Sequence, residues 1–250
     1  MGEFSSRRTP LANVVLGNKR DQVSVEAHPH QWALSFWARG FRRLASPIVV
    51  SRHVRRLCSP FTIQGAEQLS QLNTPAIIIA NHTSHFDTLI VLSLLPSRLY
   101  SQTAVAAAAD RFYRETIKGA WYSLRYNAFP IARGGGSAAL DYAEWLLQTD
   151  WSLLIFPEGT RSRTGELLPF HPGPAILALR QGVPVVPIHI QGASNILSPG
   201  TRLAQPAAVQ ACVGAPLTFD ESDSVAAVTT AMEAAMHALA QQQSIQTAAL

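Results

Sequence analysis

The segment PAIIIANHTSHFD, residues 75–87, sets the organisation of this 250-residue chain. Its apolar run at 76–80 is rich in Ile and ends abruptly in polar residues, which is typical of a strand buried on both faces of a parallel sheet. An apolar helix is expected to follow, with Ser84 or Asp87 placed to cap it. His82 and Asp87 are therefore expected at a strand-to-helix turn, on the edge of an α/β sheet where ligand sites form.

The spacing of His82 and Asp87 supports a turn rather than a continuous helix. Five residues along a helix correspond to about 500° of rotation, so the two side chains would diverge. On a turn that enters a helix they can converge, and a carboxylate bound to one imidazole nitrogen leaves the other free as a general base. The alternative is a helix entry with a hydrogen-bonded surface histidine, because the spacing alone is common.

Strands and helices are expected to alternate along the rest of the chain. Buried or extended segments are predicted at 103–109, 129–133, 152–156, 183–190 and 207–213, and helices at 111–126, 137–148, 172–181 and 225–243. This alternation predicts an α/β fold with three layers, a mainly parallel central sheet and flanking helices. The catalytic domain is assigned to residues 58–243, and residues 244–250 are interpreted as a frayed tail.

The composition is apolar and its charge is uneven. Hydrophobic residues make up 47% and charged residues 14%, below the usual quarter for a soluble domain. Residues 1–60 hold ten Lys and Arg against three Asp and Glu, so the basic excess lies at the front of the chain. The two cysteines, Cys58 and Cys212, are too few for a disulfide framework and indicate a reducing compartment.

Two segments precede the predicted catalytic domain. Residues 1–30 lack periodicity and are interpreted as a flexible arm; their Arg and Ser content leaves organellar targeting open, while Glu3, Asp21 and Glu26 argue against it. Residues 31–57 have helical periodicity, with a second helix starting at Ser46-Pro47. The residues expected to contact a membrane surface are Trp32, Phe36, Trp37, Phe41, Arg42 and Arg43.

A basic, aromatic-rich helical pair of this kind is suited to lying in an anionic membrane surface. The alternative is a helical hairpin that packs on the domain and leaves its arginines in water. No apolar run approaches the ~20 residues of a spanning helix. The chain is therefore expected to be a peripheral, monotopic protein on the cytoplasmic face of a membrane.

A second concentration of polar groups follows the predicted strand at 152–156. Arg161 and Thr160, with the backbone N–H groups of this loop, are suited to binding a phosphate, and Glu158 can accept from a ligand hydroxyl or from Arg161. A purely structural charged turn is the alternative. Arg133 precedes three glycines and a helix start, which is another arrangement suited to an anion.

Other classes of site fit the sequence less well. The pattern Gly134-x-Gly136-x-x-Ala139 matches a dinucleotide fingerprint formally, but the preceding strand is short and contains Pro130. His82, His85 and Asp87 have no second cluster to complete a metal site, and no Gly-x-Ser-x-Gly motif supplies a serine nucleophile. We expect no metal, no cofactor and no nucleic-acid partner.

Four ordered blocks resemble those of the glycerolipid acyltransferases, the 1-acylglycerol-3-phosphate and related lysophospholipid acyltransferases. The blocks are Asn81-His82-Thr83-Ser84-His85-Phe86-Asp87, Phe129-Pro130-Ile131-Ala132-Arg133, Phe156-Pro157-Glu158-Gly159-Thr160-Arg161-Ser162 and Val183-Pro184-Val185-Val186-Pro187-Ile188. The resemblance covers roughly residues 60–215, and the third block is the most distinctive.

The resemblance implies a role for each block. His82 would be the general base and Asp87 would orient it. The acceptor's phosphate end would be held by Arg133, Glu158, Gly159, Thr160 and Arg161. The acyl or acceptor pocket would be lined by Val183, Pro184, Val185 and Pro187.

The substrates implied are an acyl-CoA or acyl-carrier-protein thioester as co-substrate and a lysophospholipid acceptor, lysophosphatidic acid foremost. Two departures affect the acceptor side. Ala132 stands where the family has an acidic residue, and His171 stands where it has a lysine. The rival hypothesis is a non-catalytic lipid-binding module on the same fold, which would have no need of the histidine base.

Overall fold

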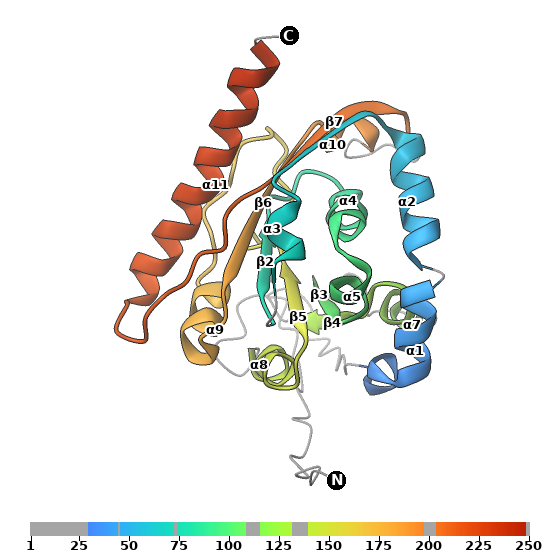
Figure 1. Cartoon of the computed structure of the whole chain (residues 1–250), viewed down its shortest axis with the longest axis vertical. Helices are drawn as coiled ribbons and strands as arrows, with labels where there is room; N and C mark the ends of the chain where they lie inside the picture. Colours follow the sequence, from blue (N-terminus) through green and yellow to red (C-terminus); the bar gives the residue numbers. More distant parts are fainter. Residues whose placement is uncertain are drawn as a thin grey trace, which may run out of the picture.

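A computed structural model describes residues 30–44, 46–72, 75–108, 116–131, 140–197 and 204–248 (Figure 1). These residues form a seven-stranded sheet in the order β1-β7-β6-β2-β5-β3-β4. The strands are β1 (Cys58–Gln64), β2 (Ile77–Ala80), β3 (Thr103–Ala108), β4 (Ala128–Ile131), β5 (Ser152–Ile155), β6 (Val185–Gln191) and β7 (Ala207–Val213).

The sheet is mainly parallel, as predicted. β6, β2, β5, β3 and β4 run in one direction, while β7 is antiparallel to β6 and β1 is parallel to β7. In the centre, Ile77 of β2 pairs with Leu153 of β5 and with Val185 of β6. β2 is fully buried, which explains why its sequence is an uninterrupted apolar run.

Helices cover both faces of the sheet and complete three layers. They are η1 (Gln31–Leu34), α1 (Phe36–Leu44), α2 (Ser46–Leu57), α3 (Glu67–Ser70), α4 (Asp87–Leu94), α5 (Ser97–Ser101), α7 (Thr116–Tyr126), α8 (Asp141–Gln148), α9 (Gly173–Gln181), α10 (Ala193–Ile196) and α11 (Val225–Ala248). The hydrophobic core consists of two clusters, one on each face of the sheet, and successive side chains of β2 point alternately into them. Ile77 and Ile79 pack with α8, α9 and α11, whereas Ile78 and Ala80 pack with α2, α4 and α10.

Several predicted boundaries need correction. Neither Ser84 nor Asp87 caps α4 as predicted, because α4 begins at Asp87 and Phe86 at its N-cap makes no side-chain bond. α11 continues to Ala248, and so into the segment 244–250 that was predicted to be a frayed tail. Strand β1 was not predicted, and the predicted segments at 109–115 and 132–139 lie outside the described residues.

The N-terminal helices pack on the domain instead of standing apart from it. Val50 and Val54 of α2 are buried in the core beside α4, and α1 packs against α5 and α7. The predicted limit at residue 57 coincides with the end of α2, but the core crosses it. In the described part of the chain, no helix is both long and apolar enough to span a bilayer.

Arg42 was predicted to contact a membrane, and the structure contradicts this. Its side chain is 1% exposed, and its guanidinium donates to the carbonyl oxygens of Ala33, Ser123 and Leu124. Burial lowers its pKa to about 10, so it stays charged at neutral pH. Because Ser123 and Leu124 lie in the last turn of α7, the positive charge also complements the negative end of that helix.

We expect Arg42→Ala to destabilise the fold by at least about 2 kcal/mol, because it leaves three backbone carbonyls without their donor inside the protein. Arg43 is the matched control, since it is the next residue of α1 and is exposed. Arg43→Ala should change stability by less than about 0.5 kcal/mol. Urea unfolding of both variants measures the difference, and equal midpoints would contradict the structural role of Arg42.

Candidate active site

The carboxyl ends of β2 and β5 lie side by side and carry the polar residues of the site. Ile79 of β2 pairs with Ile155 of β5, so the chain leaves both strands at the same edge of the sheet. Asn81, 2% exposed, anchors the turn after β2: its Nδ2 donates to the carbonyl of Ile190 (2.9 Å) and its Oδ1 accepts from the N–H of Ile190 (2.7 Å). The turn that carries His82 is thereby fastened to β6.

His82 and Asp87 converge on this turn, as their spacing predicts. Nδ1 of His82 lies 2.9 Å from Oδ2 of Asp87. The same oxygen accepts from the N–H groups of Thr83 (2.7 Å) and Ser84 (2.8 Å), and the carboxylate is fully buried. Three donors on one oxygen hold the carboxylate in place, so it can fix the orientation of the imidazole.

This arrangement selects one form of the neutral imidazole. A carboxylate only accepts hydrogen bonds, so Nδ1 donates and Nε2 keeps its lone pair. The ring of His82 stacks on Phe156 of the neighbouring loop at 4.3 Å between centroids, and the side chain is 18% exposed. A fixed, partly accessible nitrogen of this kind can act as a general base.

Glu158 positions the site, in place of the predicted direct contact with an acceptor. It is 3% exposed, and its two oxygens accept from the N–H groups of His82 (2.7 Å) and Leu168 (3.0 Å). Burial raises the pKa of this carboxyl, an effect that the two backbone hydrogen bonds oppose. Glu158 therefore joins the turn after β2 to the segment that follows its own loop.

The loop after β5 lies against His82 through further backbone bonds. The N–H of Ser162 donates to the carbonyl of His82 (2.8 Å), and the N–H of His171 donates to the carbonyl of Pro157 (2.9 Å). Gly159 has φ +65°, and a Cβ there would lie 2.8 Å from Cδ2 of the His171 ring. The positive φ favours glycine at this position, and a side chain there would also require the exposed His171 ring to move.

The remaining residues predicted to hold the acceptor are only partly placed. Thr160 is exposed and Arg161 is partly buried; both lie between Gly159 and Ser162, and so in the loop that contacts His82. Arg133 lies outside the described residues. Of the five residues predicted for the phosphate, four therefore lie in one described loop, and one of these four is the positioning carboxylate of Glu158.

Block four was predicted to line the acyl or acceptor pocket, and the structure places its residues in β6 and directly before it. β6 is parallel to β2, and Val185 pairs with Ile77, so Val183 and Pro184 precede the strand at the edge opposite His82. Val185 is fully buried and Pro187 is buried beside Gly214. Val185 and Pro187 belong to the core because they lie in β6, which pairs with the central strand β2.

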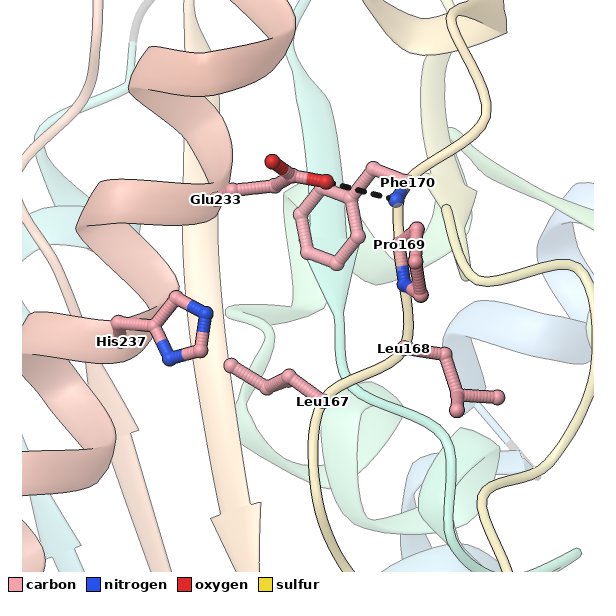
Figure 2. Close-up of a pocket in the computed structure, with 6 residues that line it drawn as sticks. All are labelled: Leu167, Leu168, Pro169, Phe170, Glu233 and His237. Atoms are coloured by element: carbon pink, nitrogen blue, oxygen red, sulfur yellow. Dashed lines mark hydrogen bonds between the residues drawn. The ribbon is translucent and has the colours of Figure 1, made fainter.

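Glu233 on α11 is a positioning residue that the sequence analysis missed. Its Oε1 accepts from the N–H of Phe170 (2.8 Å), two residues beyond the N–H that Glu158 binds. The segment between the loop and α11 is thus held by two carboxylates. A hollow of about 230 Å³ lies here, shown in Figure 2. Its lining residues are Leu167, Leu168, Pro169, Phe170, Glu233 and His237.

No sequence motif marks Glu233, because it lies in an Ala-rich amphipathic helix far along the chain. Within the described residues, no group of three or more His, Cys, Asp and Glu side chains could hold a metal ion. The described residues at this edge supply a histidine base, a positioning carboxylate and a polar, Arg-containing loop.

Comparison with known proteins identifies the family. The model of the family described as Acyltransferase matches residues 60–191, which is more than half of the chain and includes the turn after β2 and the loop after β5. The chain belongs to the acyltransferase family. The resemblance carried by the four blocks is confirmed.

Relatives in this family are about 30% identical to the chain over the aligned segments. It is 33% identical over 169 residues to a 1-acyl-sn-glycerol-3-phosphate acyltransferase of Cocos nucifera, covering 66% of this chain and 52% of that protein. It is 29% identical over 132 residues to the human 1-acyl-sn-glycerol-3-phosphate acyltransferase beta, covering 51% of this chain and 45% of that protein. The chain thus spans about half the length of these relatives.

A solved structure confirms the fold. The 1-acyl-sn-glycerophosphate (LPA) acyltransferase PlsC of Thermotoga maritima superposes with a TM-score of 0.66 at 23% identity, covering 81% of each chain. The three-layer fold therefore recurs in this acyltransferase.

We expect Glu158→Gln to destabilise this acyltransferase-family protein by about 1–3 kcal/mol, although the two side chains have the same shape. Glutamine has one acceptor oxygen, so its NH₂ group must face the N–H of either His82 or Leu168. Glu166→Gln is the control, because Glu166 is exposed in the same loop. Urea unfolding measures the effect, and two indistinguishable variants would show that the bridge contributes nothing.

Proposed function

We propose that this protein transfers a fatty acyl group from a thioester of coenzyme A or acyl carrier protein to the free hydroxyl of a lysophospholipid. The proposed acceptor is 1-acylglycerol-3-phosphate and the product is phosphatidic acid. The observation that carries the proposal is the buried Asp87 carboxylate that orients His82 at the carboxyl edge of the sheet. The names of the relatives support the choice of acceptor.

The proposed acyl transfer requires a general base but no nucleophile on the enzyme. A thioester is already activated, so no covalent enzyme intermediate is required, whereas the acceptor hydroxyl has a pKa far above 7. Nε2 of His82 takes the hydroxyl proton as the oxygen attacks the thioester carbonyl, and Asp87 stabilises the imidazolium that forms. The C–S bond then breaks, and the imidazolium returns the proton to the departing thiolate.

The tetrahedral intermediate needs hydrogen-bond donors for its oxyanion. The backbone N–H groups nearest the base are already engaged: those of Thr83 and Ser84 bind Asp87, that of His82 binds Glu158, and that of Ser162 binds the His82 carbonyl. These four N–H groups hold the base in place. In the proposed mechanism the oxyanion is therefore stabilised by hydrogen-bond donors other than these four.

His82→Ala should lower kcat at least about 100-fold, because a positioned general base contributes typically 10²- to 10⁴-fold. Asp87→Asn should lose nearly as much, since the amide does not stabilise the imidazolium. His85→Ala is the matched control, three residues from the base in the same turn, and should retain most activity. Transfer of radiolabelled acyl groups to lysophosphatidic acid measures all three.

The same assay separates catalysis from the rival lipid-binding function. More than about a tenth of the wild-type rate in His82→Ala would exclude a base worth 100-fold. If the wild-type protein forms no product with any donor or lysolipid tested, the chain is a non-catalytic lipid-binding module.

The loop after β5 is the proposed site for the acceptor's phosphate. Thr160 and Arg161 lie between Gly159 and Ser162, whose N–H binds the backbone of His82, so a phosphate held there lies close to the base. A guanidinium can grip a phosphate through two parallel hydrogen bonds. Arg133 is the second proposed phosphate ligand, on the strength of the resemblance in block two.

Arg161→Ala should raise the KM for lysophosphatidic acid by at least about tenfold, and Arg161→Lys should restore only part of it because lysine lacks the planar fork. Arg163→Ala is the control, because Arg163 is exposed two residues further along the loop. Steady-state kinetics with varied acceptor provides the readout. A KM unchanged in Arg161→Ala would remove this residue from the phosphate site.

The protein is proposed to act at a membrane surface, because acceptor and product are lipids. Leaving the bilayer would expose their chains to water at about 0.8 kcal/mol per CH₂. On η1 and α1, four aromatic side chains predicted to meet the membrane are exposed: Trp32 46%, Phe36 79%, Trp37 82% and Phe41 42%. Arg43 is exposed beside them, in contrast to Arg42.

We expect Phe36→Ser combined with Trp37→Ser to release the full-length protein from anionic liposomes without unfolding it, because both side chains are largely exposed. Point substitutions are preferable to deletion of residues 1–57, which would uncover the core against which Val50 and Val54 pack. Ile63→Ser with Ile245→Ser is the control, since both residues are exposed on other elements. Co-sedimentation equal to wild type would place the membrane contact elsewhere.

A further inference from the structure

Helix α7 presents an apolar face that the proposed reaction does not use. Ile117 is 86% exposed and Trp121 is 54% exposed, and their spacing of four residues puts them on one face of the helix. Gly119 and Ser123, which point about 200° away, are buried. α7 therefore packs on the protein with one side and presents isoleucine and tryptophan to solvent with the other.

Such exposure is concentrated in one region of the described chain. Isolated exposed apolar residues are ordinary on any protein, whereas a gathering of them indicates an interaction surface. Eleven large apolar side chains are exposed in the described residues, and all but Ile63 and Ile245 lie on η1, α1, α2 or α7. α7 thus shares this property with the N-terminal helices.

The apolar face of α7 is connected to those helices. α1 packs against α7, and Arg42 of α1 binds the carbonyls of Ser123 and Leu124 in its last turn. Figure 1 shows the two helices beside each other, on the side of the sheet away from α11. Ile117 and Trp121 therefore lie on a helix that packs directly against α1.

The direction of α7 determines which of its ends lies near the active site. α7 lies between β3 and β4, which are parallel neighbours, so it must run back along the sheet from the carboxyl ends toward the amino ends of the strands. Its first turn, with Ile117, is thus at the edge that holds His82 and Glu158. Its last turn is the one that α1 contacts.

We infer that Ile117 and Trp121 form a second membrane contact, which carries the lipid-facing surface from the N-terminal helices to the edge of the active site. The inference rests on the proposed membrane-surface function. The partner is an anionic phospholipid bilayer, because the exposed basic residues of the neighbouring helices complement its charge. They are Arg43, Arg52, Arg55 and Arg56.

Two separated membrane contacts would fix the orientation of the domain on the bilayer, which a single contact would not. A domain held only by η1 and α1 would tilt freely about that attachment, with its catalytic edge at varying depths. With Ile117 also in the interface, the sheet edge that carries His82 is held beside the headgroups. The acceptor then reaches the base without its acyl chain leaving the bilayer.

Environment-sensitive labels on the full-length protein test this directly. An NBD fluorophore is attached to cysteine in three separate variants: Trp121→Cys, Trp37→Cys and Ile245→Cys. The native thiols of Cys58 and Cys212 are buried, and burial raises their pKa, that of Cys58 to about 12, so they react slowly. The probes are phosphatidylcholine–phosphatidylglycerol vesicles, with and without brominated acyl chains.

The expected result is a blue shift and bromine quenching at positions 37 and 121, and neither at position 245. If position 37 responds and position 121 behaves like 245, the inference is overturned while the N-terminal contact stands. If neither 37 nor 121 responds, both membrane contacts fail, and the acyl-transfer assay still tests the reaction independently. A response at 121 without vesicles that grows with protein concentration would assign this face to a second copy of the chain and overturn the inference.

Substitution provides a second measure. Ile117→Ser with Trp121→Ser should weaken vesicle binding by at least about tenfold, because two large side chains no longer leave water. Ile63→Ser with Ile245→Ser should bind as wild type does. Unfolding midpoints confirm that both double variants are folded, and an affinity for vesicles within about twofold of wild type in the α7 variant would refute the contact.

Discussion

The hydrogen bond from the N–H of His82 to Glu158 is the interaction on which the site depends. It joins the ends of two neighbouring parallel strands, which bring their polar turns together but cannot by themselves fix the relative position of those turns. With the second oxygen of Glu158 on the N–H of Leu168, one carboxylate sets the distances among three segments. The base, the Arg-containing loop and the segment before α9 are thereby built as one unit.

A second carboxylate, that of Asp87, also accepts several hydrogen bonds in the site. Asp87 is fully buried, and its Oδ2 takes the N–H groups of two residues as well as the imidazole, so the negative charge is held by donors that cannot move. Oδ1 has no hydrogen-bond partner among the described residues. Within the described part of the chain, the hydrogen bonds to this carboxylate are therefore all accepted by Oδ2, the oxygen that orients His82.

Some features of the fold and the site were predictable from the sequence, and others depended on contacts between distant segments. The convergence of His82 and Asp87 was predictable, because only a turn allows that spacing to close. The apolar run at 183–188 correctly indicated a buried strand but could not say which of its ends faces the site; the register with β2 decides that. β1 was missed because it contains Pro60 and alternates imperfectly, as an edge strand does.

Burial of a charged residue was the hardest property to predict. Arg42 lies one helical turn from Ala38, which is also buried, so the two share the face of α1 that turns toward the protein. The sequence pattern of basic residues between aromatic ones did not indicate that Arg42 is buried. Arg42 and Arg43 are adjacent arginines, and they differ only in the face of α1 that they occupy. Glu233 was out of reach for a similar reason, since its partner is a backbone N–H sixty-three residues away.

The contact between Gly159 and His171 has a consequence for how sequences of this kind can diverge. Positive φ alone would admit asparagine, which tolerates the left-handed region better than other residues with a side chain. A Cβ at position 159 would lie 2.8 Å from Cδ2 of His171, so the imidazole, the exposed end of a flexible side chain, would have to turn aside. The two positions are therefore coupled through the space they share: an asparagine at 159 requires another rotamer of His171, whereas a smaller residue at 171 would leave that space open.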